Sequence, residues 1–359
     1  KFTIRNKKKI SYFTLGFVIL LIFGSSLINS NNYLMDDLKP ENEMKKSFNY
    51  MDETFGGVRP FEMAIELKDT TKSLWDADIL QQINGVEEYL QNEYGVDIKI
   101  SLNQTLKVLN RSSNLGDTTY FQTPTKKSKI RSLKRMIKVA DEGNFVRMFM
   151  DSTELKTRIS GTIPDWGNNK VTALNVGLDD FIQKNTKAEE LTFKLTGTAH
   201  LLDLNMSYLS KSLLYGLLFA IILVAIIMGL LYRSFKMVII SLIPNLIPLL
   251  VIGAIMGFFG INLKITTAIV FTISFGIAVD DTIHFLSKFK LELNKRKSVP
   301  YALKRTIVGT GKAIVLTSAI LCSGFLLLLF SDFLGTFYMG LMISVTLFFA
   351  VLADLFLLP

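Results

Sequence analysis

Two adjacent carboxylates and an imidazole stand inside an apolar stretch of this chain. Asp280 and Asp281 are followed by His284, and the residues around them are apolar enough to lie in a bilayer. A charged side chain at bilayer depth costs about 2.5 to 3.5 kcal/mol on insertion scales, so such residues usually face a bundle interior and mark an ion or proton path. On a helix, residues three or four positions apart share a face, so at least one carboxylate can meet the imidazole. The spacing predicts a site where the two acids bind and release protons as a coupled unit.

Hydroxyl groups in a neighbouring apolar stretch extend this candidate relay. Thr317 and Ser318 could bond to the carboxylates, although such hydroxyls often bond their own backbone four residues back. Gly276 precedes Asp280 by one helical turn and leaves room for a close helix or for water. The alternative interpretation is that the acids only cap the cytoplasmic end of a span and that the imidazole is structural. The predicted proton relay comprises Asp280, Asp281, His284, Thr317 and Ser318.

Two further features of the apolar stretches concern shape and packing. Pro244, Asn245 and Pro248 form a Pro-Asn-x-x-Pro motif in the third stretch. Each proline removes a helical hydrogen bond, so a kink or hinge is expected there, although proline is also common in spanning helices. Asp354, in the last stretch, is another carboxylate, for which a packing or snorkelling role is as good an interpretation as a relay role.

Several kinds of chemistry have no visible site in this sequence. The chain contains no phosphate-binding Gly-x-x-x-x-Gly-Lys-Ser/Thr loop, no His-Glu-x-x-His and no Gly-x-Ser-x-Gly. With two His and one Cys, a zinc centre is not expected either. The chain is therefore predicted not to be an enzyme and to need no metal or cofactor, with the proton as its only coupling ion.

Six apolar runs of about 20 residues, the length that crosses about 30 Å of hydrocarbon, define the spans. Between residues 31 and 210 the chain carries 23 Lys+Arg against 26 Asp+Glu, whereas the rest of the chain has a net charge of +12. This excess lies on alternate connections, at Lys1 and Arg5 to Lys9, near Arg233, and from Lys288 through Lys297 to Lys312. The positive-inside rule puts these clusters in the cytoplasm. The six runs are Ile10 to Ile28, Leu213 to Tyr232, Met237 to Phe259, Ile265 to Phe285, Ala313 to Phe330 and Phe337 to Leu358.

The resulting organisation has three parts. Residues 1–30 form a first transmembrane helix with a basic cytoplasmic start, 31–210 an extracytoplasmic domain, and 211–359 a five-helix transmembrane domain. We expect a multi-pass protein of the bacterial inner membrane with residues 31–210 in the periplasm. The high basic charge is an orientation signal, so nucleic acid is not expected as a partner. Pro300, at the start of a helical pattern that continues to Lys304, predicts a short amphipathic helix on the cytoplasmic membrane surface before the fifth span.

The outer domain shows two strand–helix–strand patterns in series. Strands are expected at Arg59 to Leu67, Val96 to Leu102, Leu155 to Ile163 and Glu190 to Thr198, with helices at Ala77 to Tyr94 and Asn169 to Lys184. This order predicts a ferredoxin-like split βαβ domain with an insertion between Leu106 and Asp151. The insertion carries a helical run of Lys and Arg from Lys126 to Arg135, interpreted either as a solvated face or as a patch for an anionic ligand or lipid headgroup.

The layout and motifs together resemble one repeat of the resistance-nodulation-division (RND) superfamily, closest to its MMPL-type, hydrophobe/amphiphile exporter branch. The resemblance is carried by one span, an outer domain and five spans, and by Pro244-Asn-x-x-Pro248, Gly276-x-x-x-Asp280-Asp281, Gly311-x-Ala313, Thr317-Ser318 and Gly324-Phe325. It implies an α-helical membrane protein with an α+β porter domain inserted after the first of six helices. It also implies a second six-span repeat as partner, and the chain is interpreted as the C-terminal half.

The function that this resemblance implies is export of hydrophobic or amphiphilic molecules, such as lipids, driven by the proton-motive force. Asp280 and Asp281 would carry the relay. Membrane lipids, the substrate and a homo-oligomer, either dimer or trimer, are the further expected partners. Two alternatives remain: an accessory factor of protein translocation similar to SecDF, and a lipid sensor similar to sterol-sensing domains. A sensor leaves the acidic pair unexplained.

Overall fold

The computed structural model describes residues 7–140, 145–295 and 298–358. Within these ranges, six helices are long and apolar enough to cross a membrane. The predicted class, a helical membrane protein with an α+β domain, is confirmed. Lys1, Arg5 and Lys297, which belong to the predicted cytoplasmic clusters, lie outside the described residues. The spanning helices are α2 (Lys7–Ser26), α8 (Thr198–Tyr232), α9 (Phe235–Phe259), α10 (Ile265–Asn294), α11 (Val299–Leu326) and α12 (Leu334–Phe356).

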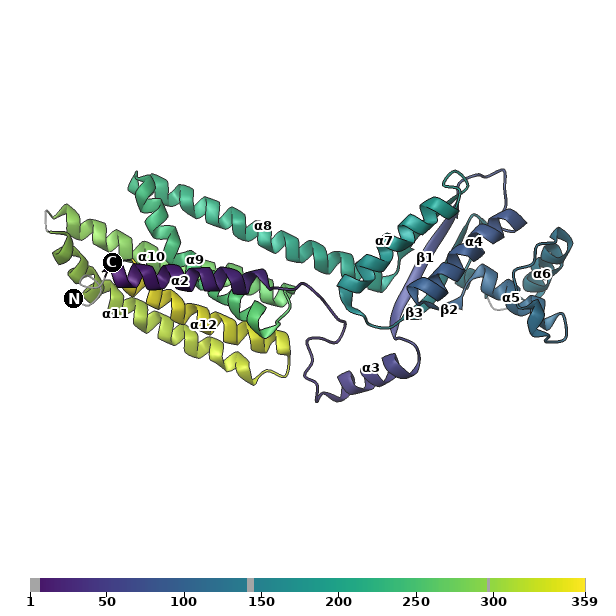
Figure 1. The fold of residues 1–359 in the computed structure, drawn as a ribbon, viewed down its shortest axis with the longest axis horizontal. Coiled ribbons are helices and arrows are strands. Elements are labelled where there is room, and N and C mark those ends of the chain that lie inside the picture. The colour runs from purple at the N-terminus through teal and green to yellow at the C-terminus, as the bar shows by residue number, and fades with distance from the viewer. Residues whose placement is uncertain (1–6, 141–144, 296–297, 359) are drawn as a thin grey trace. The chain divides into compact units, whose positions relative to one another are not determined.

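The chain divides into two compact units. Among the described residues, the membrane unit comprises 7–32, 36–39 and 206–358, and the second unit, called the outer unit after its predicted location, comprises 33–35 and 40–205. In the membrane unit, α9, α10 and α12 pack against one another, α11 packs on α10 and α12, and α2 packs on α9 (Figure 1). Their shared core contains Ile252, Val270, Phe275, Ile343 and Leu347. This packing brings polar residues from distant parts of the sequence into one bundle.

Residues 36–39 are tied to two turns of the membrane unit, to which they belong. The Lys264 ammonium at the start of α10 pairs with Asp36 at 2.7 Å and with Asp37 at 3.1 Å. The backbone N–H of Leu334, at the start of α12, donates to the carbonyl of Asp37 at 2.8 Å. Lys39 pairs with Asp332 at 3.3 Å. The two turns that precede α10 and α12 are therefore tied to residues 36–39.

The outer unit contains a four-stranded antiparallel sheet in the order β2-β3-β1-β4. This order is the one expected of a split βαβ sandwich, because each of two strand–helix–strand units contributes strands that interleave with the other's. The strands are β1 (Arg59–Leu67), β2 (Asp97–Ile100), β3 (Lys156–Ile163) and β4 (Leu191–Thr196). The helices are α4 (Ala77–Tyr89), which ends in a π-helical turn (Leu90–Tyr94), and α7 (Gly167–Asn185).

Alternation along the strands explains which face of the sheet is buried. In β1, Phe61, Met63 and Ile65 are buried while the residues between them are more exposed, as expected for a sheet with one covered face. These side chains share a core with Ile79 and Ile83 of α4. The spacing of apolar residues thus indicates both which elements form and which face of each element is buried.

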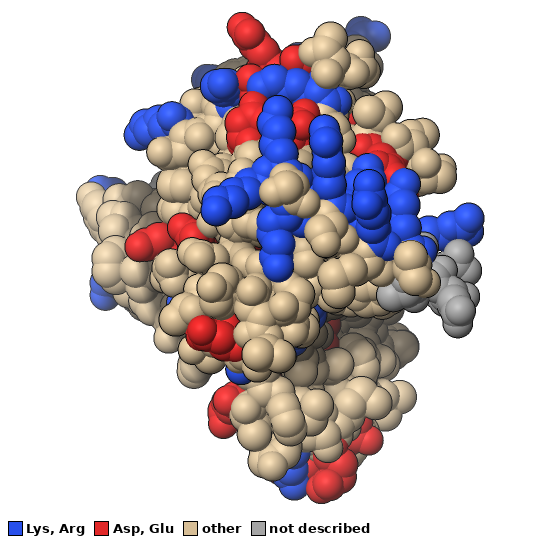
Figure 2. Space-filling view, turned by 90° about the vertical axis from the view of Figure 1, so that its right-hand side faces the viewer, with Lys and Arg blue, Asp and Glu red and all other residues tan. Residues whose placement is uncertain are grey.

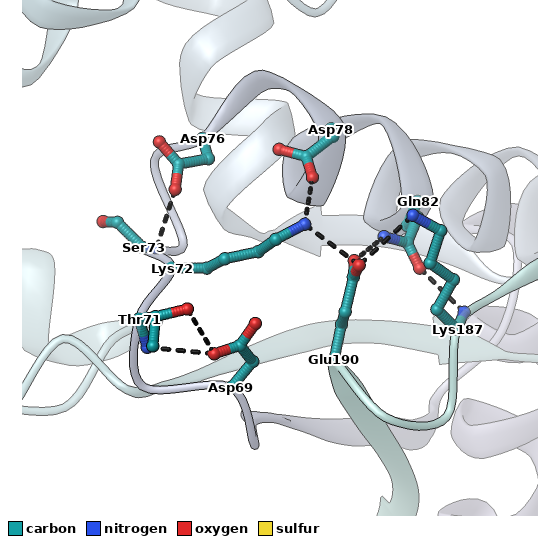
Figure 3. A network of polar contacts seen from close by, with 9 residues as sticks. All are labelled: Asp69, Thr71, Lys72, Ser73, Asp76, Asp78, Gln82, Lys187 and Glu190. Atoms are coloured by element: carbon teal, nitrogen blue, oxygen red, sulfur yellow. Dashed lines mark hydrogen bonds and ion pairs between the residues drawn. The ribbon is translucent and has the colours of Figure 1, made fainter.

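An ion-pair network connects two loops of this unit (Figure 3). Glu190, just before β4, accepts from Lys72 at 2.9 Å, from Gln82 of α4 at 2.8 Å and from Lys187 at 3.2 Å. Lys72 also contacts Asp78 at 2.5 Å. These contacts hold the pKa of Glu190 down to about 2, chiefly through the hydrogen bond from Lys72. The network links the β1–α4 loop to the α7–β4 loop.

Three elements differ from the prediction or were not predicted. The predicted surface helix around Pro300 is wrong as a separate element, because α11 runs without a break from Val299 to Leu326. Proline needs no backbone N–H in a first turn, so it can begin a spanning helix as well as a surface helix. Helices α3 (Glu43–Thr54) and α5 (Leu102–Ser112) were not predicted. The predicted insertion contains the second part of α5 and the whole of α6 (Lys127–Ala140).

Candidate functional site

Asp281 lies between two spanning helices. It is half-buried on α10, and the Ser318 hydroxyl of α11 donates to its Oδ2 at 3.3 Å. Ser318 itself is buried. These residues are 37 positions apart in the sequence, and the packing of α10 on α11 brings them together. A carboxylate in this position accepts the hydroxyl's hydrogen bond when ionised, and when protonated it has one O–H donor and can still accept.

Asp280 points in a different direction from Asp281. Its Oδ1 lies 3.4 Å from Nε2 of His284, one turn along the same helix, and the two side chains are 71% and 69% exposed. Adjacent residues on a helix point about 100° apart, which explains the separation. The acidic pair is therefore divided between a half-buried acid that faces α11 and an exposed acid that contacts the imidazole.

Both acids nevertheless line one hollow, with a volume of about 910 Å³, between α10 and α11. His284 and Lys288 of α10 and Thr317 of α11 line it as well. The Thr317 hydroxyl donates to backbone carbonyls of its own helix, at 3.0 Å from both Ala313 and Ile314. Of the two predicted hydroxyls, Ser318 thus contacts an acid and Thr317 contacts its own backbone. The relay role of all five residues stays a prediction.

A second polar cluster lies deeper in the bundle. Oγ1 of Thr282, the residue after Asp281, is 2.8 Å from Oδ1 of Asp354 on α12 and 3.0 Å from Oδ1 of Asn245 on α9. Asn245 in turn donates through Nδ2 to the backbone carbonyl of Ser241 at 2.7 Å. Asn245, Thr282 and Asp354 are each no more than 1% exposed. Three spanning helices therefore meet at one buried hydrogen-bonded chain.

The sequence only partly indicated this cluster. Asn245 was identified within the proline motif, and Asp354 was named with packing or snorkelling as an equal alternative. Because Asp354 is fully buried, snorkelling to the surface is wrong. Thr282 was missed, although a hydroxyl directly after an acidic pair in an apolar helix is a usable signal.

The predicted packing residues have different surroundings. Pro244 and Pro248 are buried inside α9, which continues through both of them. A side chain at Gly276 would meet nothing within 4 Å. Of the two alternatives predicted at Gly276, the described residues bring no helix close, and the space beside Gly276 is open, as the alternative of room for water requires.

The basic run of the insertion forms a distinct patch of the outer unit. Figure 2 shows Lys and Arg side chains gathered on one face, and α6 supplies this run. Lys134 and Lys138 pair with Glu154 at 2.5 Å and 3.2 Å. The exposed members Lys127 and Arg131 make no ion pair within the part of the chain that the structure describes. Part of the patch is thus neutralised locally, as a solvated helix face would be.

No group of three or more His, Cys, Asp or Glu that could hold a metal ion occurs among residues 7–140, 145–295 and 298–358. The chemistry that the site offers comes from carboxylates, hydroxyls and one imidazole. These groups can exchange protons with water or with one another.

Comparison with known proteins identifies the family that this chain matches. The model of the MMPL family matches residues 134–359, which is more than half of the chain. A protein of the archaeon Methanocaldococcus jannaschii, described only as a membrane protein, is 23% identical over 374 aligned residues. The alignment covers 98% of this chain and 92% of that relative. The family match includes every residue of the two polar clusters.

Proposed function

Because this chain belongs to the MMPL family, whose members are membrane transporters, we propose that it exports hydrophobic or amphiphilic molecules at the expense of the proton-motive force. The chain is a multi-pass membrane protein with six spanning helices among its described residues. Substrates of this class, such as lipids, would reach the protein from the membrane or from its outer surface. The proposal covers the energy source, the substrate class and the direction of transport.

The observation that carries the proposal is the position of Asp281. It lies half-buried in a spanning helix, bonded to Ser318 and open to a hollow that also holds Asp280 and His284. Asp281 makes no ion pair within 4 Å among the described residues, and it can bind a proton from water in the hollow. Protonation would neutralise it and free α10 to shift against α11, and release of the proton would reset the pair.

The energy available is sufficient for such a cycle. A membrane potential supplies about 2.3 kcal/mol per charge per 100 mV. The shift of α10 would reach the outer unit through the chain itself, since α8 is one helix that begins before residue 206 and continues into the membrane unit. We propose that the helix movement drives substrate binding and release by the outer unit.

The orientation and partners of the transporter follow from charge and from the family layout. We propose that the basic clusters face the cytoplasm and that residues 31–210 lie on the opposite side, which is the periplasm if the membrane is a bacterial inner membrane. A second six-span unit, in a dimer or trimer of this chain or in a longer protein, would face α10. Membrane lipids would surround the assembly.

The test measures lipid transport and proton flux in proteoliposomes that contain the full chain. A fluorescent lipid analogue in the bilayer supplies the substrate, and an imposed pH gradient supplies the driving force. Asp281→Asn is expected to abolish gradient-dependent movement of the analogue. Ser318→Ala is expected to weaken it, because the hydrogen bond to Asp281 is lost.

Ser323→Ala is the matched control. Ser323 lies on the same helix as Ser318 but is exposed, and its hydroxyl donates to the Ala319 carbonyl of its own helix at 2.8 Å, so transport should be unchanged. If Asp281→Asn transports the analogue as the unaltered protein does, the proton-driven mechanism is wrong. If unfolded polypeptide and not the lipid analogue stimulates proton flux, the chain is a translocation factor.

A further inference from the structure

The buried chain of Asn245, Thr282 and Asp354 contains more acceptors than donors. The Asn245 amide must direct its Nδ2 at the Ser241 carbonyl, because a backbone carbonyl can only accept. Its Oδ1 therefore faces Thr282 as an acceptor. Thr282 Oγ1 also faces Oδ1 of Asp354, and its hydroxyl has a single hydrogen to serve both.

Every contact in this chain has one donor and one acceptor when Asp354 carries a proton. Asp354 then donates to Thr282, Thr282 donates to Asn245, and Asn245 donates to the Ser241 carbonyl. An ionised Asp354 would accept the one hydrogen bond that Thr282 can donate. The oxygen atoms of Thr282 and Asn245 would then lie 3.0 Å apart with no hydrogen between them. A buried chain that is only partly satisfied is unfavourable.

The surroundings of Asp354 favour the neutral acid as well. Its Oδ2 is buried and has no hydrogen-bond partner among the described residues. The ionisable group that acts on it from α10 is Asp281, which has the same sign of charge when ionised. On α11, Cys322 bonds to the backbone of Ser344, and on α2, Lys9 lines a separate apolar cavity. Among the described residues no basic side chain pairs with Asp354, and a buried carboxylate without a counter-charge is strongly disfavoured.

We propose that Asp354 is a second proton-binding site of this transporter, loaded in the present structure and linked to Asp281 through Thr282. This inference rests on the proposed function. Thr282 directly follows Asp281 on α10, so a shift of α10 that moves Asp281 also separates Thr282 from Asp354. Losing the Thr282 contact leaves the acid without the acceptor of its proton, and the proton can then leave to water. Ionisation and reloading of Asp354 would thus follow the movement of α10.

The first experiment detects the proton directly. Infrared spectra of the full chain in lipid at pH 8 are expected to show a protonated carboxyl C=O band that Asp354→Asn removes and Asp281→Asn keeps. Thr282→Val, which preserves the shape but not the hydroxyl, should shift this band. An identical C=O region in the unaltered protein and in Asp354→Asn would overturn the proposal.

The second experiment asks whether the proton is exchanged. Asparagine imitates the neutral acid, with an amide that donates to Thr282, so Asp354→Asn should fold but keep the site permanently neutral. Proton flux under an imposed gradient is expected to fall at least tenfold. Thr346→Val is the matched control, because Thr346 is buried on the same helix and bonds only its own backbone, at 2.6 Å from the Met342 carbonyl.

The outcomes separate the two proposals. Full flux in Asp354→Asn together with lost flux in Asp281→Asn overturns the second site and leaves the proposed function intact. Full flux in Asp281→Asn overturns the proposed function, whereas the infrared band still reports whether Asp354 holds a proton.

Discussion

Replacing Glu87 with glutamine is expected to remove most of the pH dependence of the outer unit's stability between pH 4.5 and about 7. Glu87 lies on the inner face of α4 and is 1% exposed. Burial raises its pKa from 4.5 to about 7, against the opposing effects of the Ser101 hydroxyl and of Lys107. The Lys107 ammonium is 3.8 Å from Oε2, which is a long contact for an ion pair. The acid is therefore neutral in the folded unit under mildly acidic conditions.

The sign and size of the effect follow from proton linkage. Between pH 4.5 and about 7 the folded unit binds a proton that the unfolded chain releases, so the free energy of unfolding falls as pH rises through this window. Each tenfold change in proton affinity is worth about 1.36 kcal/mol, so the full loss is about 3 kcal/mol. Glutamine keeps the shape without the titration. At pH 8 Glu87→Gln should thus be the more stable protein by up to about 3 kcal/mol, and near pH 4 the two should be similar.

The assay uses the natural tryptophans. Both tryptophans of the chain, Trp75 and Trp166, lie in the outer unit, so their fluorescence during urea unfolding of the full protein reports on that unit. Glu88→Gln is the matched control, because Glu88 is the exposed neighbour of Glu87. A free energy of unfolding that does not change between acidic and alkaline pH in the unaltered protein would refute the reasoning. A marked loss of stability in Glu87→Gln at pH 8 would show that the Lys107 ion pair dominates instead.

Three further predictions concern packing and charge. Arg59→Ala should destabilise the outer unit by about 3 to 5 kcal/mol in the same urea assay, because it removes the cation beside the largely buried carboxylates of Asp165 and Asp203, which are 6% and 16% exposed; an unchanged midpoint would contradict this. Gly257→Ala should lower the melting temperature in detergent, since its Cβ would lie 1.8 Å from the Gly24 carbonyl oxygen, whereas Gly16→Ala, with open space, should not. Glu190→Gln should lower stability at neutral pH but not near pH 2, because the lowered pKa makes its contribution present above 4.5 and lost as pH falls to about 2.

The energetics of the Arg59 site illustrate how burial changes the value of an ion pair. Arg59 begins β1 and is fully buried, with Asp165 at 3.2 Å and Asp203 in direct contact. Burial raises the pKa of Asp165 in spite of the guanidinium beside it. Removing the arginine is therefore expected to cost far more than removing an exposed lysine.

The sequence by itself determined the spans and the outer fold. Apolar runs long enough for a bilayer can form only spanning helices, because every backbone group must be bonded within the segment. Period-two alternation in β1 and the order of strands and helices were sufficient for the sheet topology. The acidic pair was visible for the same reason, since charge inside an apolar run is rare.

The tertiary structure decided which polar groups meet. Thr282 contacts Asn245 and Asp354, which are 37 and 72 residues away, and no local pattern relates these positions. Helix periodicity gives the face on which a side chain lies, but the helix against which that face packs depends on how α9, α10 and α12 fit together. That fit placed Ser318 against Asp281 and buried Asp354 beside the Thr282 hydroxyl.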